Sequence, residues 1–302
     1  MTLFTLKNVS NEDHNRYKDF FSDPGMFNDL NIPIKTQNPT GLLSKITGFE
    51  VEKLVLKDEI PVFYIGFLKS ASEVTINTML FNKEFLNEDE LFKFIKEEIL
   101  DKKTIFGLGY DFSYMTSDNE INVEVMEKLG FTPEKRFRVM NILLDRLYLT
   151  GDQRNLNSEI HFNIVRNASD IRDRVLVQNS AFNNSNRIPL NEEDIRAEMI
   201  NSTYIHDLSL LMFDSKTPVG YGQIIRSGKM NYLVNFGIHQ DMRGKGYSNL
   251  LLEELLARTL ETGRQSLFLE VYENNIRAVK LYENHGFKTM YRKSLWHYGT
   301  EN

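Results

Sequence analysis

The segment Arg243-Gly244-Lys245-Gly246 combines two glycines with two basic side chains, between a strand-like stretch at 231–239 and a leucine-rich helix that begins near Tyr247. The first backbone N–H groups of a helix have no partner within the helix, and the aligned peptide dipoles add partial positive charge there. Glycines let an oxyanion approach the backbone, and the basic side chains can add charge at its edge. These residues predict an anion site, although a tight turn that binds nothing fits them equally well.

Two familiar phosphate loops do not fit this segment. A Walker loop needs four residues between its first glycine and Gly-Lys-Ser/Thr, and neither RGKGYS at 243–248 nor SGKM at 227–230 supplies that spacing. A dinucleotide-binding turn needs a third glycine where Asn249 stands. Any anion bound here therefore belongs to another class of ligand.

A second motif follows at 269–287, LEVYENNIRAVKLYENHGF. It has an alternating apolar strand, an Asn pair, a helix, and Gly286 where a left-handed helix stop is expected. Asn275 is in the place of a helix N-cap, because its side chain can accept from the free N–H groups of the first turn.

Together the two stretches resemble the GNAT superfamily of acyl-CoA-dependent N-acyltransferases. That family has an Arg-Gly-x-Gly-x-Gly/Ala turn, which appears here as Arg243 to Ser248 with a serine at the last position. The turn is followed by Asn-x-x-Ala-x-x-Leu-Tyr-x-x-x-Gly-Phe, matched here by Asn275, Ala278, Leu281-Tyr282 and Gly286-Phe287. The resemblance covers about residues 160–302 well and the first half weakly. Asp241 departs from the family's usual Gln or Arg, and we expect its side chain to face solvent, since it would repel phosphate if it pointed inward.

The resemblance implies acetyl-CoA as the cofactor, with coenzyme A as the product. Its pyrophosphate would lie on the backbone N–H groups of 243–248, and its amide-bearing arm would pair with the strand that ends at Ile238. Arg277 is among the residues that the resemblance assigns to the cofactor, and the alternative is that it is simply an exposed arginine on a helix. The implied cofactor-binding residues are Phe236, Gly237, Ile238, Arg243, Gly244, Lys245, Gly246, Tyr247, Ser248, Asn275 and Arg277.

The resemblance also implies that Tyr282 is the proton donor to the leaving thiolate. A phenol has an ordinary pKa of ~10 and stays protonated at neutral pH, so it can serve as an acid. A core aromatic on a buried helix face is the alternative for this residue. The base that must deprotonate the amine is not identified, because the strand 231–239 has no carboxylate, and His239 and Glu270 are the remaining candidates.

The predicted reaction is acetyl transfer to a primary amine, by direct attack on the thioester. A small molecule and a peptide or protein amine all remain possible acceptors, and specificity would come from loops and helices such as 170–201. The alternative is a non-catalytic protein that binds or senses acyl-CoA, and a ligand-free structural module is a third reading. The oligomeric state stays open.

The elements that position these residues occur twice. Asn119 precedes Phe131 by the same interval that separates Asn275 from Phe287, at an offset of 156, and Pro61 and Pro218 occupy equivalent strand positions at an offset of 157. We therefore expect an α/β (α+β) protein of two tandem GNAT-like domains at 1–153 and 154–302, joined through the polar segment 151–159. Each domain would be a mixed, mostly antiparallel sheet flanked by helices.

The first copy lacks the anion site. The equivalent segment LNEDELF at 86–92 has no glycine and carries three consecutive carboxylates, so Asn87 and Glu90 are predicted to form a capping box instead. Met126 stands in the place of Tyr282 and cannot donate a proton. This copy is expected to bind no acyl-CoA, and either to help wall the acceptor site or to act only as a scaffold.

Composition excludes several other classes. The net charge of −6 lies entirely in residues 1–150, which argues against a nucleic-acid partner, because such binding needs a basic face. The chain has no cysteine, so it has no disulfide, thiolate metal site or cysteine nucleophile, and its six histidines show no paired metal-ligand spacing. No apolar run approaches the ~20 residues that span a bilayer. We expect a soluble cytoplasmic protein with no membrane partner.

Overall fold

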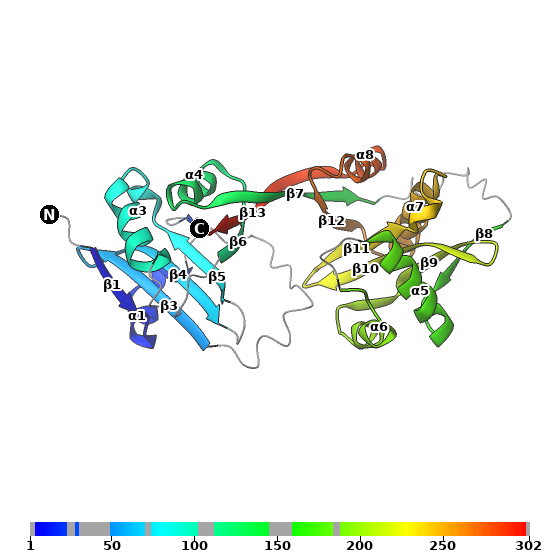
Figure 1. Cartoon of the computed structure of the whole chain (residues 1–302), viewed down its shortest axis with the longest axis horizontal. Coiled ribbons are helices and arrows are strands. Elements are labelled where there is room, and N and C mark those ends of the chain that lie inside the picture. The colour runs from blue at the N-terminus through cyan, green and yellow to red at the C-terminus, as the bar shows by residue number, and fades with distance from the viewer. Residues whose placement is uncertain are drawn as a thin grey trace. The chain divides into compact units, whose positions relative to one another are not determined.

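The computed structural model describes residues 4–22, 28–29, 49–69, 74–101, 112–144, 159–183 and 188–299. The chain forms two compact units (Figure 1). Unit 1 comprises Met1–Phe137 together with Tyr291–Asn302, and unit 2 comprises Arg138–Met290.

Unit 1 contains a five-stranded antiparallel sheet in the order β1-β3-β4-β5-β2. Its strands are β1 (Phe4–Asn8), β2 (Asn28–Asp29), β3 (Phe49–Lys57), β4 (Ile60–Lys69) and β5 (Val74–Phe81). The other elements are α1 (Asn11–Arg16), α2 (Lys18–Ser22), η3 (Lys83–Phe85), α3 (Asp89–Ile95), η4 (Lys96–Leu100), β6 (Phe112–Ser117) and α4 (Glu120–Lys128).

Unit 2 has antiparallel strands followed by one parallel pair, so its sheet is mixed and mostly antiparallel, as predicted. Neighbouring strands follow the order β8-β9-β10-β11-β12. Its elements are β8 (Ile160–Ile164), α5 (Ala168–Ala181), α6 (Glu192–Met199), β9 (Tyr204–Asp214), β10 (Thr217–Ser227), β11 (Met230–Ile238), η6 (Gln240–Met242), α7 (Tyr247–Glu261), β12 (Ser266–Tyr272) and α8 (Ile276–Asn284).

Two long strands, β7 (Thr132–Leu143) and β13 (Lys288–Tyr298), exchange places, because each is the neighbour of a strand from the other half of the chain. In unit 2, β7 is the neighbour of β12, and Asn141 Nδ2 donates to the carbonyl of Leu267 at 3.2 Å. In unit 1, β13 pairs antiparallel with β6, from Lys293 opposite Ser117 to Tyr298 opposite Phe112. Each unit therefore includes residues of a strand from the other half of the chain. The compact units do not follow the division at 153 that the repeat suggests.

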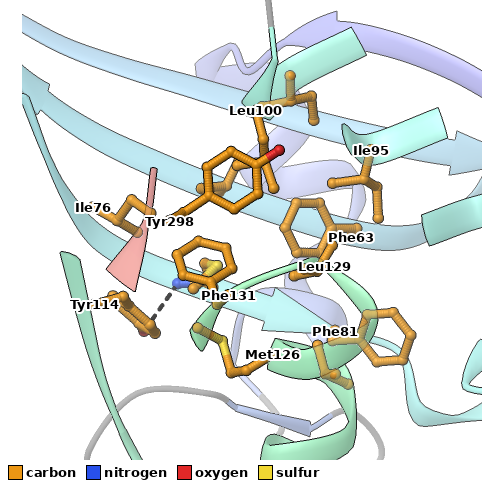
Figure 2. Packing of buried hydrophobic residues seen from close by; sticks show 14 of the residues in the cluster. Phe63, Ile76, Phe81, Ile95, Leu100, Tyr114, Met126, Leu129, Phe131 and Tyr298 are labelled. Atoms are coloured by element: carbon orange, nitrogen blue, oxygen red, sulfur yellow. Dashed lines mark hydrogen bonds between the residues drawn. The ribbon is translucent and has the colours of Figure 1, made fainter. Parts of the chain in front are cut away.

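The exchanged strand supplies core residues to unit 1. Trp296 has 0% of its surface exposed and Tyr298 has 6%, and both belong to the apolar cluster between β4, β5 and α4. Figure 2 shows Tyr298 beside Phe131, with ring centroids 5.0 Å apart. The same view shows Tyr114, whose hydroxyl accepts from the backbone N–H of Met79 at 3.2 Å.

The repeated helix signals are confirmed in both copies. The side chain of Asn119 accepts from Asn122 N at the start of α4, and that of Asn275 accepts from Ala278 N at the start of α8. Both helices are followed by a glycine in the left-handed region, with φ of 86° and 91° at positions 130 and 286. The two segments separated by the offset of 156 are therefore similar in structure as well as in sequence.

The predicted capping box at Asn87 and Glu90 is wrong. Helix α3 begins one residue later, with Glu88 at the N-cap position and no side-chain cap hydrogen bond. The Glu88 carboxylate instead pairs with Lys57 Nζ of β3 at 2.6 Å. Glu88 at the helix start is thus held by an ion pair to a distant strand, a partner that local spacing does not reveal.

Candidate functional site

The ladder between β11 and β12 in unit 2 is short. The two parallel strands pair only at Tyr232 with Phe268 and at Leu233 with Leu269, so the ladder ends well before β11 does. Residues 234–238 continue as a strand against β10 on one side. Their other edge faces β12 without ladder pairing, which leaves backbone groups available to an extended ligand.

A bulge distorts β11 just before the predicted cofactor-binding residues. Tyr221 of β10 lies opposite Gly237, whereas Gln223 lies opposite Val234, so two residues of β11 face the single residue between them. Asn235 lies in this bulge with a left-handed φ of 53°. The bulge changes the direction of Phe236, Gly237 and Ile238 relative to the rest of the strand.

The predicted anion-binding turn is exposed at the start of α7. Gly244 and Gly246 have φ of 82° and 83°, a conformation that glycine adopts without strain. Gly246 is the N-cap of α7 and provides no side-chain cap, so first-turn N–H groups of this helix face outward. A Cβ at either glycine would meet no atom within 4 Å. Backbone conformation therefore requires these glycines, and the turn has the form that an oxyanion cradle needs.

The charged residues of the turn have different roles. Arg243 Nη2 donates to the carbonyl of Ala181 at 2.7 Å and its Nε to that of Ile238 at 3.4 Å, so its guanidinium ties the turn to the end of α5. Lys245 is exposed, with Nζ 3.5 Å from the sulfur of Met242. The Asp241 side chain is 88% exposed, which confirms that it faces solvent.

Helix α7 is anchored at its first residues by Tyr247. The hydroxyl of Tyr247 donates to a carboxylate oxygen of Asp214, at the end of β9, and this hydrogen bond raises the pKa of the phenol. Ser248 is half-buried in the first turn of the helix. Tyr247 and Ser248 therefore lie in the first turn of α7, beside its N-terminal backbone N–H groups.

Tyr282 lies on the buried face of α8 and is 7% exposed. Its ring contacts Phe236 of β11, with centroids 6.1 Å apart, and Phe287, at 5.7 Å. Burial raises the pKa of this phenol above its ordinary value, so it stays protonated at neutral pH. In the part of the chain that the structure describes, nothing hydrogen-bonds its hydroxyl. Tyr282 is both a core aromatic and a protonated acid beside β11.

The remaining predicted residues are at the surface of unit 2. Asn275 caps α8, and Arg277 is exposed on the same helix. Of the two candidate bases, His239 has its ring nitrogen Nδ1 3.9 Å from the carboxylate of Asp241, and Glu270 is exposed on β12. No geometry among them singles out a base.

Sequence reasoning missed a buried polar network around Arg174 of α5 and Gln223 of β10, both almost fully buried. The available signal was the position of Arg174 and Gln178, one helical turn apart, on the side of α5 that also carries Ile171 and Val177. Residues four apart on an otherwise apolar face point into the core together.

Over the residues described, no three His, Asp or Glu side chains gather as a metal site would require. No helix within those ranges combines the length and apolar character needed to cross a membrane.

Comparison with known proteins gives consistent results. The family model described as "Acetyltransferase (GNAT) family" matches residues 179–287. The uncharacterized N-acetyltransferase YdgE of Bacillus subtilis (strain 168) is 34% identical over 67 residues, which cover 22% of this chain and 43% of that protein. The alignment thus spans less than half of the length of this relative.

Solved structures of the same fold extend the similarity over the whole chain. A GCN5-related N-acetyltransferase from Sphaerobacter thermophilus has a TM-score of 0.61 at 19% identity, covering 82% of this chain and 80% of that one. A tandem GNAT protein from the clavulanic acid biosynthesis pathway has a TM-score of 0.61 at 10% identity, covering 99% and 100%. At these identities the likeness concerns the fold, and it confirms the predicted fold class.

Proposed function

We propose that this chain transfers an acetyl group from acetyl-CoA to a primary amine, using unit 2, because residues 179–287 match the model of the GNAT acetyltransferase family. The observation that carries the proposal is the adjacency of two features: an exposed left-handed glycine turn at the start of α7, and a strand, β11, whose ladder with β12 ends at Leu233. The glycine turn suits a pyrophosphate, and the unpaired edge of β11 suits an amide-bearing arm.

The glycine turn would hold the pyrophosphate through backbone N–H groups of 243–248, where the dipole of the fifteen-residue helix α7 is also favourable. Lys245 would add a positive charge at the rim. Arg243 would act indirectly, because its hydrogen bonds to backbone carbonyls keep the turn in place. Asp241 faces solvent and leaves the cradle free of negative charge.

The free edge of β11 would hold the amide-bearing arm as an added strand. Backbone N–H groups of the segment 236–238 that face away from β10 would also polarise the thioester carbonyl, an oxyanion-type contribution that needs no side chain. Acetyl-CoA supplies the activated acyl group: the amine nitrogen bonds to the carbonyl carbon as the bond to sulfur breaks.

Tyr282 would donate its proton to the departing thiolate. Its contact with Phe236 places the phenol beside the strand that would hold the thioester, and its burial keeps the proton on the oxygen until it is needed. The base that removes the proton from the amine is left unassigned.

We propose no acyl-CoA site in unit 1. Met126, which replaces Tyr282 in the repeat, is fully buried in the apolar core of this unit. Helix α3 begins with Glu88, Asp89 and Glu90, which would repel a phosphate at its N-terminus.

The test is a thiol-release screen with acetyl-CoA and panels of small-molecule, aminoglycoside, peptide and protein amines, combined with calorimetric titration of acetyl-CoA. Transfer to one class of amine is expected. Titration without release of thiol from any panel would favour the alternative, a non-catalytic acyl-CoA-binding protein. That alternative has one observation in its favour, since β11 carries no carboxylate to serve as a base. Absence of binding would refute both.

The acid role is tested by Tyr282→Phe, with Tyr232→Phe as a matched control, because Tyr232 is another buried tyrosine of unit 2. Removal of a general acid is expected to lower kcat by ~100-fold or more. The affinity for acetyl-CoA should remain close to that of the wild type. Full activity of Tyr282→Phe would show that the residue is only a core aromatic.

A further inference from the structure

A charged and polar network lies between helix α5 and the sheet of unit 2, where apolar residues would normally pack. Arg174, with 0% of its surface exposed, stacks on Tyr221, with Cζ 4.4 Å from the ring centroid. Its Nη2 donates to the Glu198 carboxylate at 2.5 Å, and its Nε donates to Gln178 at 3.1 Å. The cost of burying the guanidinium is offset by these partners.

The network converges on one oxygen atom. Oε1 of Gln223, a residue with no exposed surface, accepts from Arg174 Nη2 at 3.4 Å, from the Tyr221 hydroxyl at 3.1 Å and from Asn235 Nδ2 at 3.2 Å. The last of these bonds reaches across to β11. Gln223 therefore connects the buried arginine to the bulge of the strand that would hold acyl-CoA.

Asn235 needs such support. Its φ of 53° is uncommon for a residue other than glycine, and asparagine tolerates it better than most. Strained conformations persist where the surrounding structure holds them in place. The hydrogen bond to Gln223 provides that restraint from the neighbouring strand, opposite the point where the register shifts.

Two buried donors of the network, Arg174 Nη1 and Gln223 Nε2, have no protein acceptor among the residues that the structure describes. Most buried polar groups have a hydrogen-bond partner.

We propose that Gln223, held by Arg174, is a positioning residue that fixes the bulge at Asn235 and thereby orients toward the acyl-CoA arm those backbone N–H groups of 236–238 that do not face β10. The inference rests on the proposed function, because acyl-CoA is the ligand that this strand would bind. Neither Gln223 nor Arg174 touches the cofactor in this arrangement; both act through β11.

The kinetic test compares Gln223→Met, which removes the shared acceptor, with Gln223→Glu, which keeps an acceptor oxygen in the same place. Because small misplacements of reacting groups cost up to ~100-fold in rate, Gln223→Met is expected to lower kcat/KM for acetyl-CoA at least about tenfold. The KM for the amine should not change. Gln223→Glu should recover activity to within about threefold of the wild type.

A second variant covers the case in which Gln223→Met does not fold. Asn235→Gly adopts the left-handed φ freely but lacks the hydrogen bond to Gln223. It should also lower kcat/KM for acetyl-CoA. Asp58→Gly is the matched control, since Asp58 has a φ of 49° in the β3–β4 turn of unit 1.

Hydrogen–deuterium exchange on the chain without cofactor separates this inference from the proposed function. Both variants should exchange faster at 234–238 and keep wild-type protection at 266–272. Wild-type exchange at 234–238 would overturn the positioning role, as would a uniform increase across unit 2, which would show a purely structural network. If the wild type fails to bind acetyl-CoA, the proposed function fails while the exchange result still decides whether Gln223 holds the bulge.

Discussion

Replacing Gly244 with alanine gives a quantitative test of the anion cradle. The residue has φ of 82°, and a Cβ there would meet no atom within 4 Å, so the substitution adds backbone strain and no clash. A left-handed conformation costs an alanine about 1–2 kcal/mol relative to glycine. If the turn keeps its conformation without ligand, this cost appears as lower stability, about 2–4 °C in Tm for each kcal/mol in a unit of this size.

If the turn instead relaxes in the free protein, the cost appears on binding, and the Kd for acetyl-CoA rises about 5- to 30-fold. The loss of folding free energy and the loss of binding free energy should together come to about 1–2 kcal/mol. Differential scanning calorimetry and isothermal titration calorimetry measure them separately. A Gly244→Ala variant with wild-type Tm and wild-type Kd would refute the reasoning.

A matched control and a charge variant complete this test. Gly263, just after α7, has φ of 77° and equally open surroundings, so Gly263→Ala should lower Tm and leave Kd unchanged. Gly244→Asp should weaken acetyl-CoA binding far more than Gly244→Ala, because a carboxylate in the cradle repels phosphate. The difference in Kd between the two variants should shrink as salt is added. An equal rise in Kd for Gly263→Ala would show that strain in the turn has no special relation to the ligand.

Three further predictions concern protonation and the exchanged strands. Because burial raises the pKa of Tyr282 above its ordinary 10.0, the kcat profile should show no loss from this residue up to pH 10; a limb below pH 9 that disappears in the phenylalanine variant would contradict this. A fragment of residues 1–153 should not unfold cooperatively, since it lacks Trp296 and the rest of β13; a calorimetric transition like that of the full chain would refute this. Lys7 and Ser10 hold the pKa of Asp13 at about 2, below its ordinary 3.8, so its contribution to stability is present above pH 3.8 and lost toward pH 2. Asp13→Asn should therefore lower Tm at pH 7 and have little effect near pH 2, and an equal loss at both pH values would contradict the assignment.

Much of the candidate site could be predicted because its features are local. The glycines at 244 and 246 and the caps at 119 and 275 depend on backbone geometry within a few residues, and each was found as expected. The two motifs and their repeat predicted the fold class for the same reason. The exposed side chain of Asp241 also followed, since phosphate and carboxylate repel each other.

Long-range partners account for the predictions that failed or were missed. Arg243 remains a predicted cofactor-binding residue, but the sequence did not reveal that its guanidinium also binds the carbonyl of Ala181, because a long side chain can reach several partners. Glu88 pairs with a strand lysine and moves the start of α3 away from Asn87. The side chain of Arg174 becomes buried only when α5 packs on β10 and β11, so its burial depends on residues far away in the sequence.

The sequence by itself determined that Arg243-Gly244-Lys245-Gly246 is a turn that opens a helix, and that the same strand and helix pattern occurs twice. Only the tertiary structure decided that β7 and β13 exchange places, that the ladder between β11 and β12 ends at Leu233, and that Tyr282 lies beside Phe236. The physical reason is that alternation in a strand specifies which face is buried, whereas the choice of neighbouring strand depends on hydrogen bonds between residues far apart in the chain.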